Sequence, residues 1–99
     1  MEKFANDNSR LHAIVSGIVQ GVGFRYFVLM HAEKLKIKGW VRNTTQGDVE
    51  IIAEGNISNL EKFLELLKTG PQSAKVLNVI TVWQKTTGEF LNFQVKPTA

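Results

Sequence analysis

The chain has 99 residues, of which 43% are hydrophobic and 21% are charged; these values are typical of one folded domain and too apolar for a disordered chain. The absence of cysteine excludes disulfides and thiolate metal ligands, and it is compatible with a reducing compartment. A formal net charge of +3 favours an anionic ligand, but it does not distinguish a small phosphate compound from a nucleic acid.

Residues 1–10 are polar and aperiodic, so we expect a flexible N-terminal tail followed by a single domain over residues 11–99. The first residues contain no apolar run of signal-peptide length, and no stretch approaches the ~20 apolar residues that span a bilayer. We therefore expect a cytoplasmic protein without membrane contact.

The first half of the domain predicts a strand followed by a helix. Residues 11–18 carry apolar side chains on both faces, which is typical of a central strand. Gly21 and Gly23 interrupt this pattern. From residue 24 to about residue 36, apolar residues recur at steps of three and four, which indicates a helix.

Two strands and a turn are expected next. Residues 39–44 form the second predicted strand, and residues 45–47 have the composition of a hairpin turn. Residues 48–55 alternate between apolar and acidic side chains, which predicts a half-buried third strand.

The last part of the chain predicts a second helix and two further strands. Asn56 or Ser58 can cap the helix, and Ser58 begins the spacing of a capping box. Gly70 and the proline after it end this helix. Residues 75–83 alternate as a fourth strand, and residues 90–95 predict a short last strand at an edge.

This order of elements, β-α-β-β-α-β plus a terminal strand, predicts the fold class. It is the split β-α-β order of the ferredoxin-like α+β fold, with an antiparallel sheet and two helices on one face. Many unrelated activities use this fold, so function must be argued from a site.

The loop Val-Gln-Gly-Val-Gly-Phe-Arg over residues 19–25 joins the first strand to the first helix. The first N–H groups of a helix lack internal partners, and the helix dipole adds positive charge, so such a loop can hold an anion. Glycines let the backbone curve around an oxyanion, and the Arg25 guanidinium can bind two phosphate oxygens at once. The predicted phosphate-binding loop consists of Gln20, Gly21, Val22, Gly23, Phe24 and Arg25.

A tight turn without a ligand is the alternative interpretation of this loop. A nucleotide is not indicated, because Tyr26 stands where a dinucleotide-binding loop needs a third glycine and no Gly-Lys-Ser/Thr follows. Tyr26 and Phe27 could edge a substrate pocket, although helix packing is the preferred interpretation for both.

Asn43 is the second candidate. In the predicted topology the first and second strands are parallel, with the third strand between them, so their carboxyl ends lie on one edge, roughly 10 Å apart. The side chain of Asn43 has both a donor and an acceptor, which suits the orientation of a water molecule. Alternatively, it bonds its own backbone at the turn.

Two segments, VSGIVQGVGFRYFV and GWVRNTTQGDVEIIAEG, resemble the two signatures of the acylphosphatase family, and the Gly-Pro at 70–71 followed by AKV also fits. The resemblance covers about residues 11–95. It implies a ferredoxin-like enzyme that hydrolyses an acyl phosphate to a carboxylate and inorganic phosphate. It also implies that Arg25 and the loop amides bind phosphate and that Asn43 positions the attacking water. Lys36 departs from the family, which often has glycine there.

The chemistry of acyl phosphates explains why such an enzyme needs few catalytic groups. The leaving group of an acyl phosphate is a carboxylate, so no general acid is needed, and phosphoryl transfer requires mainly positioning and charge neutralisation. We therefore expect no metal and no cofactor, with inorganic phosphate acting as product and inhibitor. We also expect a monomer with no nucleic-acid partner.

The remaining polar candidates are assigned structural roles. His12 and His31 have no metal-ligand spacing with nearby carboxylates, so we interpret His12 as a strand surface residue and His31 as a partly buried helix residue. Glu50 and Glu54 are expected on a solvated face, and Trp40 in the core or the hairpin.

Two rival functions remain open at this point. An RNA-recognition domain can share the fold, but the acidic side chains of the third strand would repel a phosphate backbone. A phosphate sensor or regulatory subunit would keep the loop without catalysis, and phosphate binding without turnover would identify it.

Overall fold

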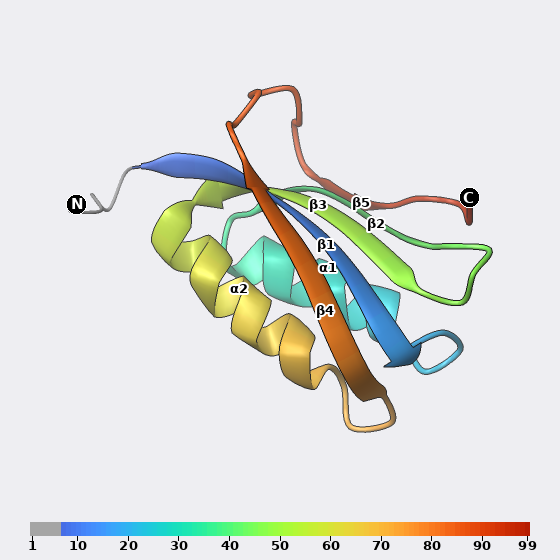
Figure 1. The fold of residues 1–99 in the computed structure, drawn as a ribbon. Coiled ribbons are helices and arrows are strands. Elements are labelled where there is room, and N and C mark those ends of the chain that lie inside the picture. The colour runs from blue at the N-terminus through green and yellow to red at the C-terminus, as the bar shows by residue number, and fades with distance from the viewer. Residues whose placement is uncertain (1–6) are drawn as a thin grey trace.

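The computed structural model of the chain describes residues 7–99, in which five strands and two helices are found (Figure 1). In chain order the elements are β1 (Asn8–Ile18), α1 (Phe24–Lys34), β2 (Lys38–Asn43), β3 (Val49–Asn56), α2 (Ile57–Thr69), β4 (Lys75–Gln84) and β5 (Phe93–Val95). Neither helix is long and apolar enough to cross a bilayer.

The strands form one sheet in the order β4-β1-β3-β2-β5, and both helices cover the same face of it (Figure 1). This arrangement confirms the predicted α+β, ferredoxin-like fold. The sheet is mixed, however, and not antiparallel throughout, because β5 pairs in parallel with β2. The reason is the connection over residues 85–92, which carries the chain from one edge of the sheet to the other and reverses its direction.

The core lies between the sheet and the two helices. On its sheet side, β2 contributes Val41 and β5 contributes Phe93. The other core residues of the sheet are alternate residues of β1 and β3, as the sequence pattern predicts: Leu11, Ala13, Val15, Val49, Ile51 and Ala53. The helices contribute residues at steps of three and four: Phe24, Val28, Ala32, Leu60, Phe63 and Leu67. Packing in the core therefore fixes the position of the start of α1 relative to the sheet.

Strand β1 begins at Asn8, three residues earlier than predicted. Asn8, Ser9 and Arg10 pair with the last residues of β3, and the Ser9 hydroxyl also donates to the carbonyl of Gln84 at 3.1 Å. These partners are far away in the sequence, so local periodicity gives no sign of them. The expected tail thus does not extend to residue 10, and residues 1–6 lie outside the described part of the chain.

Glu54 is buried on the outer face of the sheet, so its predicted exposure is wrong. Its Oε1 accepts hydrogen bonds from the Thr86 hydroxyl at 2.9 Å and from the Gly88 N–H at 3.0 Å. Its Oε2 accepts from the Thr87 N–H and hydroxyl at 2.9 and 2.8 Å, and Arg10 pairs with it at 3.2 Å. Glu54 therefore fastens the connection over residues 85–92 to the sheet.

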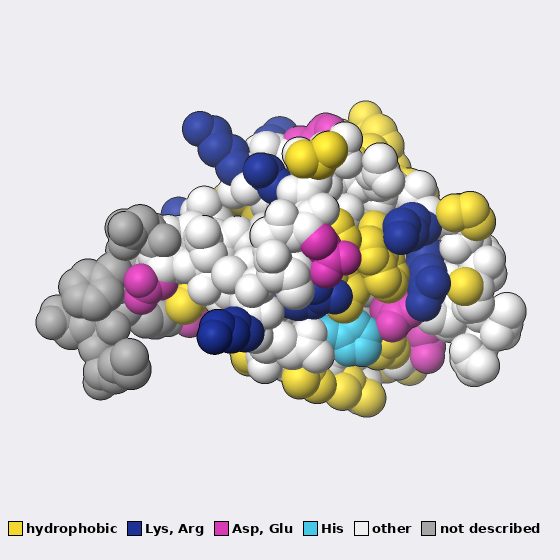
Figure 2. Space-filling view, turned by 90° about the horizontal axis from the view of Figure 1, so that it is seen from above, with side chains coloured by type: hydrophobic (Ala, Val, Ile, Leu, Met, Phe, Trp, Pro, Cys, Tyr) yellow, Lys and Arg dark blue, Asp and Glu magenta, His cyan; other side chains and the backbone are white. Residues whose placement is uncertain are grey.

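Glu50 is half-buried and ion-paired instead of freely solvated. His12 Nε2 lies 2.8 Å from one of its oxygens, and the Arg42 guanidinium bonds the other at 2.8 and 2.9 Å. The guanidinium of Arg42 also lies over the ring of Trp40, as does the amine of Lys96. Figure 2 shows acidic, basic and histidine side chains gathered together beside apolar ones. Polar side chains of β1, β2 and β3 therefore form a network on the outer face, beside apolar side chains such as Ile52 and Val82.

Acid is expected to remove the stabilisation that Glu54 provides. Burial raises the pKa of this carboxyl, but the hydrogen bonds from Thr87, Gly88 and Thr86 outweigh that effect and lower the pKa from 4.5 to about 2. A lowered folded-state pKa gives stability that is present above the unfolded pKa and is lost as the pH falls through the folded one. We expect Glu54→Gln to lower the free energy of unfolding by about 3 kcal/mol near neutral pH, and the difference to narrow towards the folded pKa.

Urea unfolding across this pH range measures the effect. Glu65→Gln is the matched control, because it removes the same charge from an exposed residue whose only described ion pair, with Lys68, lies on the surface. If Glu54→Gln were equally destabilising at every pH, the charge of Glu54 would not be what holds the connection.

Asn56 is the N-cap of helix α2, so the first of the two candidate caps is used. Asn56 Oδ1 accepts from the N–H groups of Ser58 at 2.8 Å and Asn59 at 3.4 Å. The helix ends at Thr69, and Gly70 follows with a φ of 70°. Both ends therefore agree with the sequence interpretation.

Helix α1 ends at Lys34, two residues before the predicted end. Lys36 has a φ of 57°, in the left-handed region. Its N–H bonds the carbonyl of Glu33, and the N–H of Ile37 bonds the carbonyl of Ala32 at 2.8 Å. These two bonds are a Schellman motif, whose left-handed position favours glycine.

We expect Lys36→Gly to stabilise the protein by about 1 kcal/mol, because a residue with a Cβ is strained in the left-handed region. Thermal unfolding measures the change. Lys38→Gly is the control, since Lys38 lies in β2, where glycine weakens a strand. A Lys36→Gly variant that melts below the parent would contradict the assignment of strain to this residue.

Candidate active site

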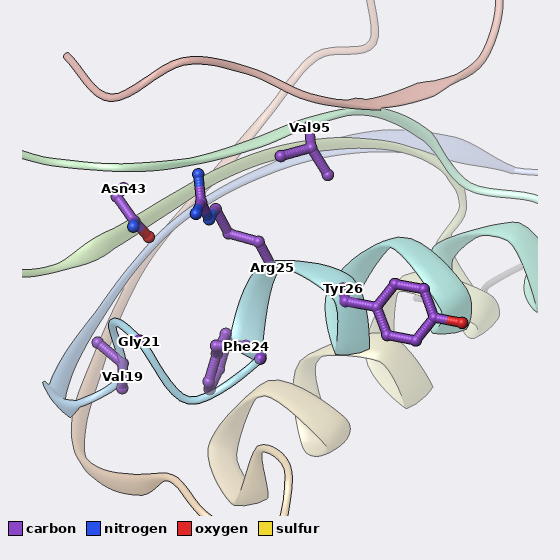
Figure 3. Close-up of a pocket in the computed structure, with 8 residues that line it drawn as sticks. Val19, Gly21, Phe24, Arg25, Tyr26, Asn43 and Val95 are labelled. Atoms are coloured by element: carbon purple, nitrogen blue, oxygen red, sulfur yellow. The ribbon is translucent and has the colours of Figure 1, made fainter.

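A cavity of about 320 Å³ opens at the carboxyl ends of β1 and β2, beside the first turn of α1 (Figure 3). It is lined by Val19, Gly21, Gly23, Phe24, Arg25, Tyr26, Asn43 and Val95. The structure thus brings the glycine loop, Arg25 and Asn43 to one cavity, as the predicted topology requires.

The glycines shape the backbone of the loop. Gly21 and Gly23 have φ angles of 73° and 77°, which residues with a Cβ rarely adopt. A Cβ on either glycine would meet no atom within 4 Å, so conformation and not crowding selects glycine here. The carbonyl of Gly23 accepts the first hydrogen bond of α1, from Phe27, at 3.1 Å.

The start of α1 has free donors. Gly23 is the N-cap and offers no side-chain acceptor, and the first turn contains no acidic residue. Throughout residues 7–99, no loop, cap or side-chain hydrogen bond involves a backbone N–H of residues 21–26 as donor. These groups, with the positive end of the helix dipole, form an anion site.

Arg25 adds a full positive charge to this site. Its side chain is half-buried and extends from α1 towards Asn43 (Figure 3). Among the residues that the structure describes, no carboxylate forms an ion pair with Arg25. The charge lies next to the positive end of α1, so a bound anion would relieve the repulsion between them.

Asn43 is the last residue of β2, where it pairs with Val49 of β3. Its Oδ1 is buried and has no hydrogen-bond partner in residues 7–99. The turn contact that we considered for Asn43 is made by Thr44, whose Oγ1 accepts from the N–H of Asp48 at 3.1 Å. Because an unpaired buried acceptor is costly, Asn43 Oδ1 is a favourable place for a donor such as water.

Three residues of the predicted loop direct their side chains elsewhere. Phe24 is buried in the core, and Val22 packs against it. The side-chain amide of Gln20 donates to the backbone carbonyls of Thr44 and Asp48. Of these three residues, Phe24 alone lines the cavity, so Gln20 and Val22 can contribute only backbone groups to a ligand there.

The cavity also includes Tyr26, for which the pocket was the less favoured interpretation, and Val95, which the sequence did not indicate. Tyr26 is 65% exposed and lines the cavity, so helix packing was the wrong preference for it, whereas Phe27 does pack against the core. Val95 comes from β5, and no local signal shows that this strand lies beside β2.

The histidines lie outside the cavity. The ring of His31 lies 4.4 Å from that of Phe27, and burial followed by the charge of Lys34 lowers its pKa. Residues 7–99 contain no group of three or more histidine and carboxylate side chains that could hold a metal ion.

The family model for acylphosphatase matches residues 11–95. This chain belongs to the acylphosphatase family. The acylphosphatase of Bacillus subtilis is 53% identical over 66 residues, which cover 67% of this chain and 72% of that protein. The acylphosphatase of Moorella thermoacetica is 45% identical over 80 residues, which cover 81% and 86%.

A solved acylphosphatase confirms the fold. The crystal structure of the Bacillus subtilis acylphosphatase superposes with a TM-score of 0.86 and 41% identity, and the match covers 89% of this chain and 98% of that one. The chain is therefore an acylphosphatase-family hydrolase of acyl phosphates, and the family resemblance seen in its sequence is confirmed. This assignment favours an enzyme over an RNA-recognition domain.

Proposed function

We propose that this acylphosphatase binds the phosphoryl group of its substrate with Arg25 and the backbone N–H groups of residues 21–25, and that Asn43 holds the attacking water. The observation that supports this most is the pair of unsatisfied groups in one cavity. The Arg25 guanidinium has no carboxylate partner in residues 7–99, and the buried Asn43 Oδ1 has no donor there.

Each group has a defined task in the proposed reaction. Arg25 and the loop amides neutralise the equatorial phosphoryl oxygens, on which charge spreads in the transition state. Asn43 Oδ1 accepts a hydrogen bond from water and holds its oxygen in line with the bond between phosphorus and the acyl oxygen.

The reaction balances without a protein acid or base. The bond between the water oxygen and phosphorus forms while the bond to the acyl oxygen breaks. The electron pair leaves with the carboxylate, and a phosphoryl oxygen takes the proton of the water. The products are a carboxylate and inorganic phosphate. Inorganic phosphate should compete with the substrate for the phosphate cradle, which is the site formed by Arg25 and the backbone N–H groups of residues 21–25.

Hydrolysis of benzoyl phosphate in excess chelator tests this function. We expect turnover without added metal and competitive inhibition by inorganic phosphate. A requirement for added metal would overturn the mechanism. Phosphate binding without turnover would identify the sensor or regulatory alternative, which keeping both Arg25 and Asn43 makes less favourable.

The remaining proposals come from the sequence alone. We propose a monomer that works in the cytoplasm without a cofactor and without nucleic-acid or membrane partners. Light scattering after size-exclusion chromatography tests the oligomeric state.

A further inference from the structure

One side chain bridges the two halves of the proposed site without facing the cavity. Gln20 follows β1 and directly precedes Gly21 of the cradle. Its Nε2 donates to the carbonyl of Thr44 at 2.9 Å and to the carbonyl of Asp48 at 2.8 Å. An amide nitrogen has two hydrogens, so both donors of Gln20 are used on the β2–β3 hairpin.

The two acceptors are the residues that close this hairpin. The N–H of Thr44 bonds the Asp48 carbonyl at 2.9 Å, and the N–H of Asp48 bonds the Thr44 hydroxyl at 3.1 Å. Thr44 directly follows Asn43, and Asp48 directly precedes Val49, the partner of Asn43 across the sheet. Gln20 therefore holds both strands of the hairpin, each one residue beyond the Asn43–Val49 pair.

The cradle needs such a support. Its glycines are exposed, and a Cβ on either would touch nothing. Between the buried side chains of Val19 and Phe24, the packing of Val22 and a hydrogen bond from the Ser73 hydroxyl to the Val22 carbonyl at 3.1 Å hold the loop, but neither contact reaches the hairpin. Arg25 follows this loop in the first turn of α1, whereas Asn43 belongs to the sheet. Within residues 7–99, the hydrogen bonds that link loop residues 20–23 to the hairpin are those of the Gln20 amide.

We propose that Gln20 is a positioning residue, which fixes the distance between the phosphate cradle and Asn43 and so the direction from which water attacks. This inference rests on the proposed function. In the proposed mechanism, the side chain of Gln20 does not contact the substrate. Because a misplacement of about 1 Å can cost about 100-fold in rate, a loosened tether affects the chemical step more than binding of the phosphoryl group.

Gln20→Met tests the tether, since methionine has a similar length but no N–H donor. We expect kcat to fall by roughly 10- to 100-fold, while the inhibition constant of inorganic phosphate changes by less than about threefold. Asn59→Leu is the matched control, because it removes an amide that donates to the carbonyl of Leu35 at 3.1 Å, at the opposite end of α1. It should leave kcat unchanged.

A double-mutant cycle separates positioning from stability. If Gln20 acts through Asn43, then Gln20→Met should cost no further activity in an Asn43→Ala background. Equal costs in both backgrounds would overturn the inference, and so would a phosphate inhibition constant that rises as much as kcat falls. All assays are run well below the lowest melting temperature of the set.

The outcomes distinguish this inference from the function on which it rests. An inactive parent protein would refute the proposed function, whereas an active parent with a fully active Gln20→Met variant would refute only the tether. If Gln20→Met does not fold, Gln20→Leu is also uncharged and also removes both N–H donors, and the same pattern in the cycle is expected.

Discussion

Arg25→Ala is expected to lower kcat/KM for an acyl phosphate by about 1,000-fold and to weaken inhibition by inorganic phosphate at the same time. The guanidinium extends into the cavity and has no carboxylate partner in the described chain. Its charge therefore acts on the ligand in both the ground state and the transition state, so binding and turnover should suffer together. Steady-state kinetics with benzoyl phosphate and phosphate inhibition measure both effects.

Two further variants sharpen this test. Arg25→Lys keeps the charge but lacks the planar fork that holds two oxygens, so its activity should lie between those of the parent and of Arg25→Ala. Lys68→Ala removes the same charge from an exposed position on α2 and should leave the kinetics unchanged. If Arg25→Lys were as active as the parent, two-point contact with the phosphoryl group would be ruled out.

Asn43→Ala should have the second-largest effect, a fall in kcat of about 100-fold with little change in phosphate inhibition. The buried Oδ1 of Asn43 lacks a partner in residues 7–99, and the attacking water of the proposed reaction would donate to it. Losing it removes an interaction with the attacking water and leaves the cradle intact. Steady-state kinetics should show that kcat falls while the inhibition constant of inorganic phosphate stays nearly the same.

Asn78→Ala is the control for this experiment, since Asn78 is exposed on the edge strand β4, away from the cavity. A fully active Asn43→Ala variant would remove Asn43 from the mechanism. Phosphate affinity falling in step with kcat would instead place Asn43 among the phosphate-binding groups.

Most of the fold could be predicted because its signals are local. Alternation in β1 and β3 and steps of three and four in α1 and α2 correspond to the buried residues. The parallel pairing of β5 and the burial of Glu54 could not be predicted, because both depend on the connection over residues 85–92. Its contacts join residues more than 30 positions apart, which leaves no periodic trace.

The candidate site divides in the same way. Gly21, Gly23 and Arg25 are adjacent in the sequence, and the order of strands was enough to bring Asn43 to them. Gln20 was predicted to belong to the phosphate-binding loop, but its side-chain amide donates to two carbonyls of the β2–β3 hairpin. Its position in the sequence gives no sign of these partners. The spacing of residues in the sequence does not show which side chains line the cavity and which ones hold its walls in place, because that depends on the three-dimensional structure.

The charge of Arg25 at the start of α1 has no carboxylate partner in residues 7–99. It is needed for the proposed catalysis, but it lowers the thermal stability of the protein. Without an anion, Arg25 opposes the helix dipole and Asn43 Oδ1 is buried without a donor in the described chain, so both residues lower the stability of the empty enzyme. Selection for survival at high temperature in phosphate-free buffer would therefore enrich inactive variants at these two positions. The same selection in saturating phosphate would retain Arg25, because phosphate stabilises only a folded protein that still binds it, but it would not retain Asn43, which holds water and not phosphate in the proposed site.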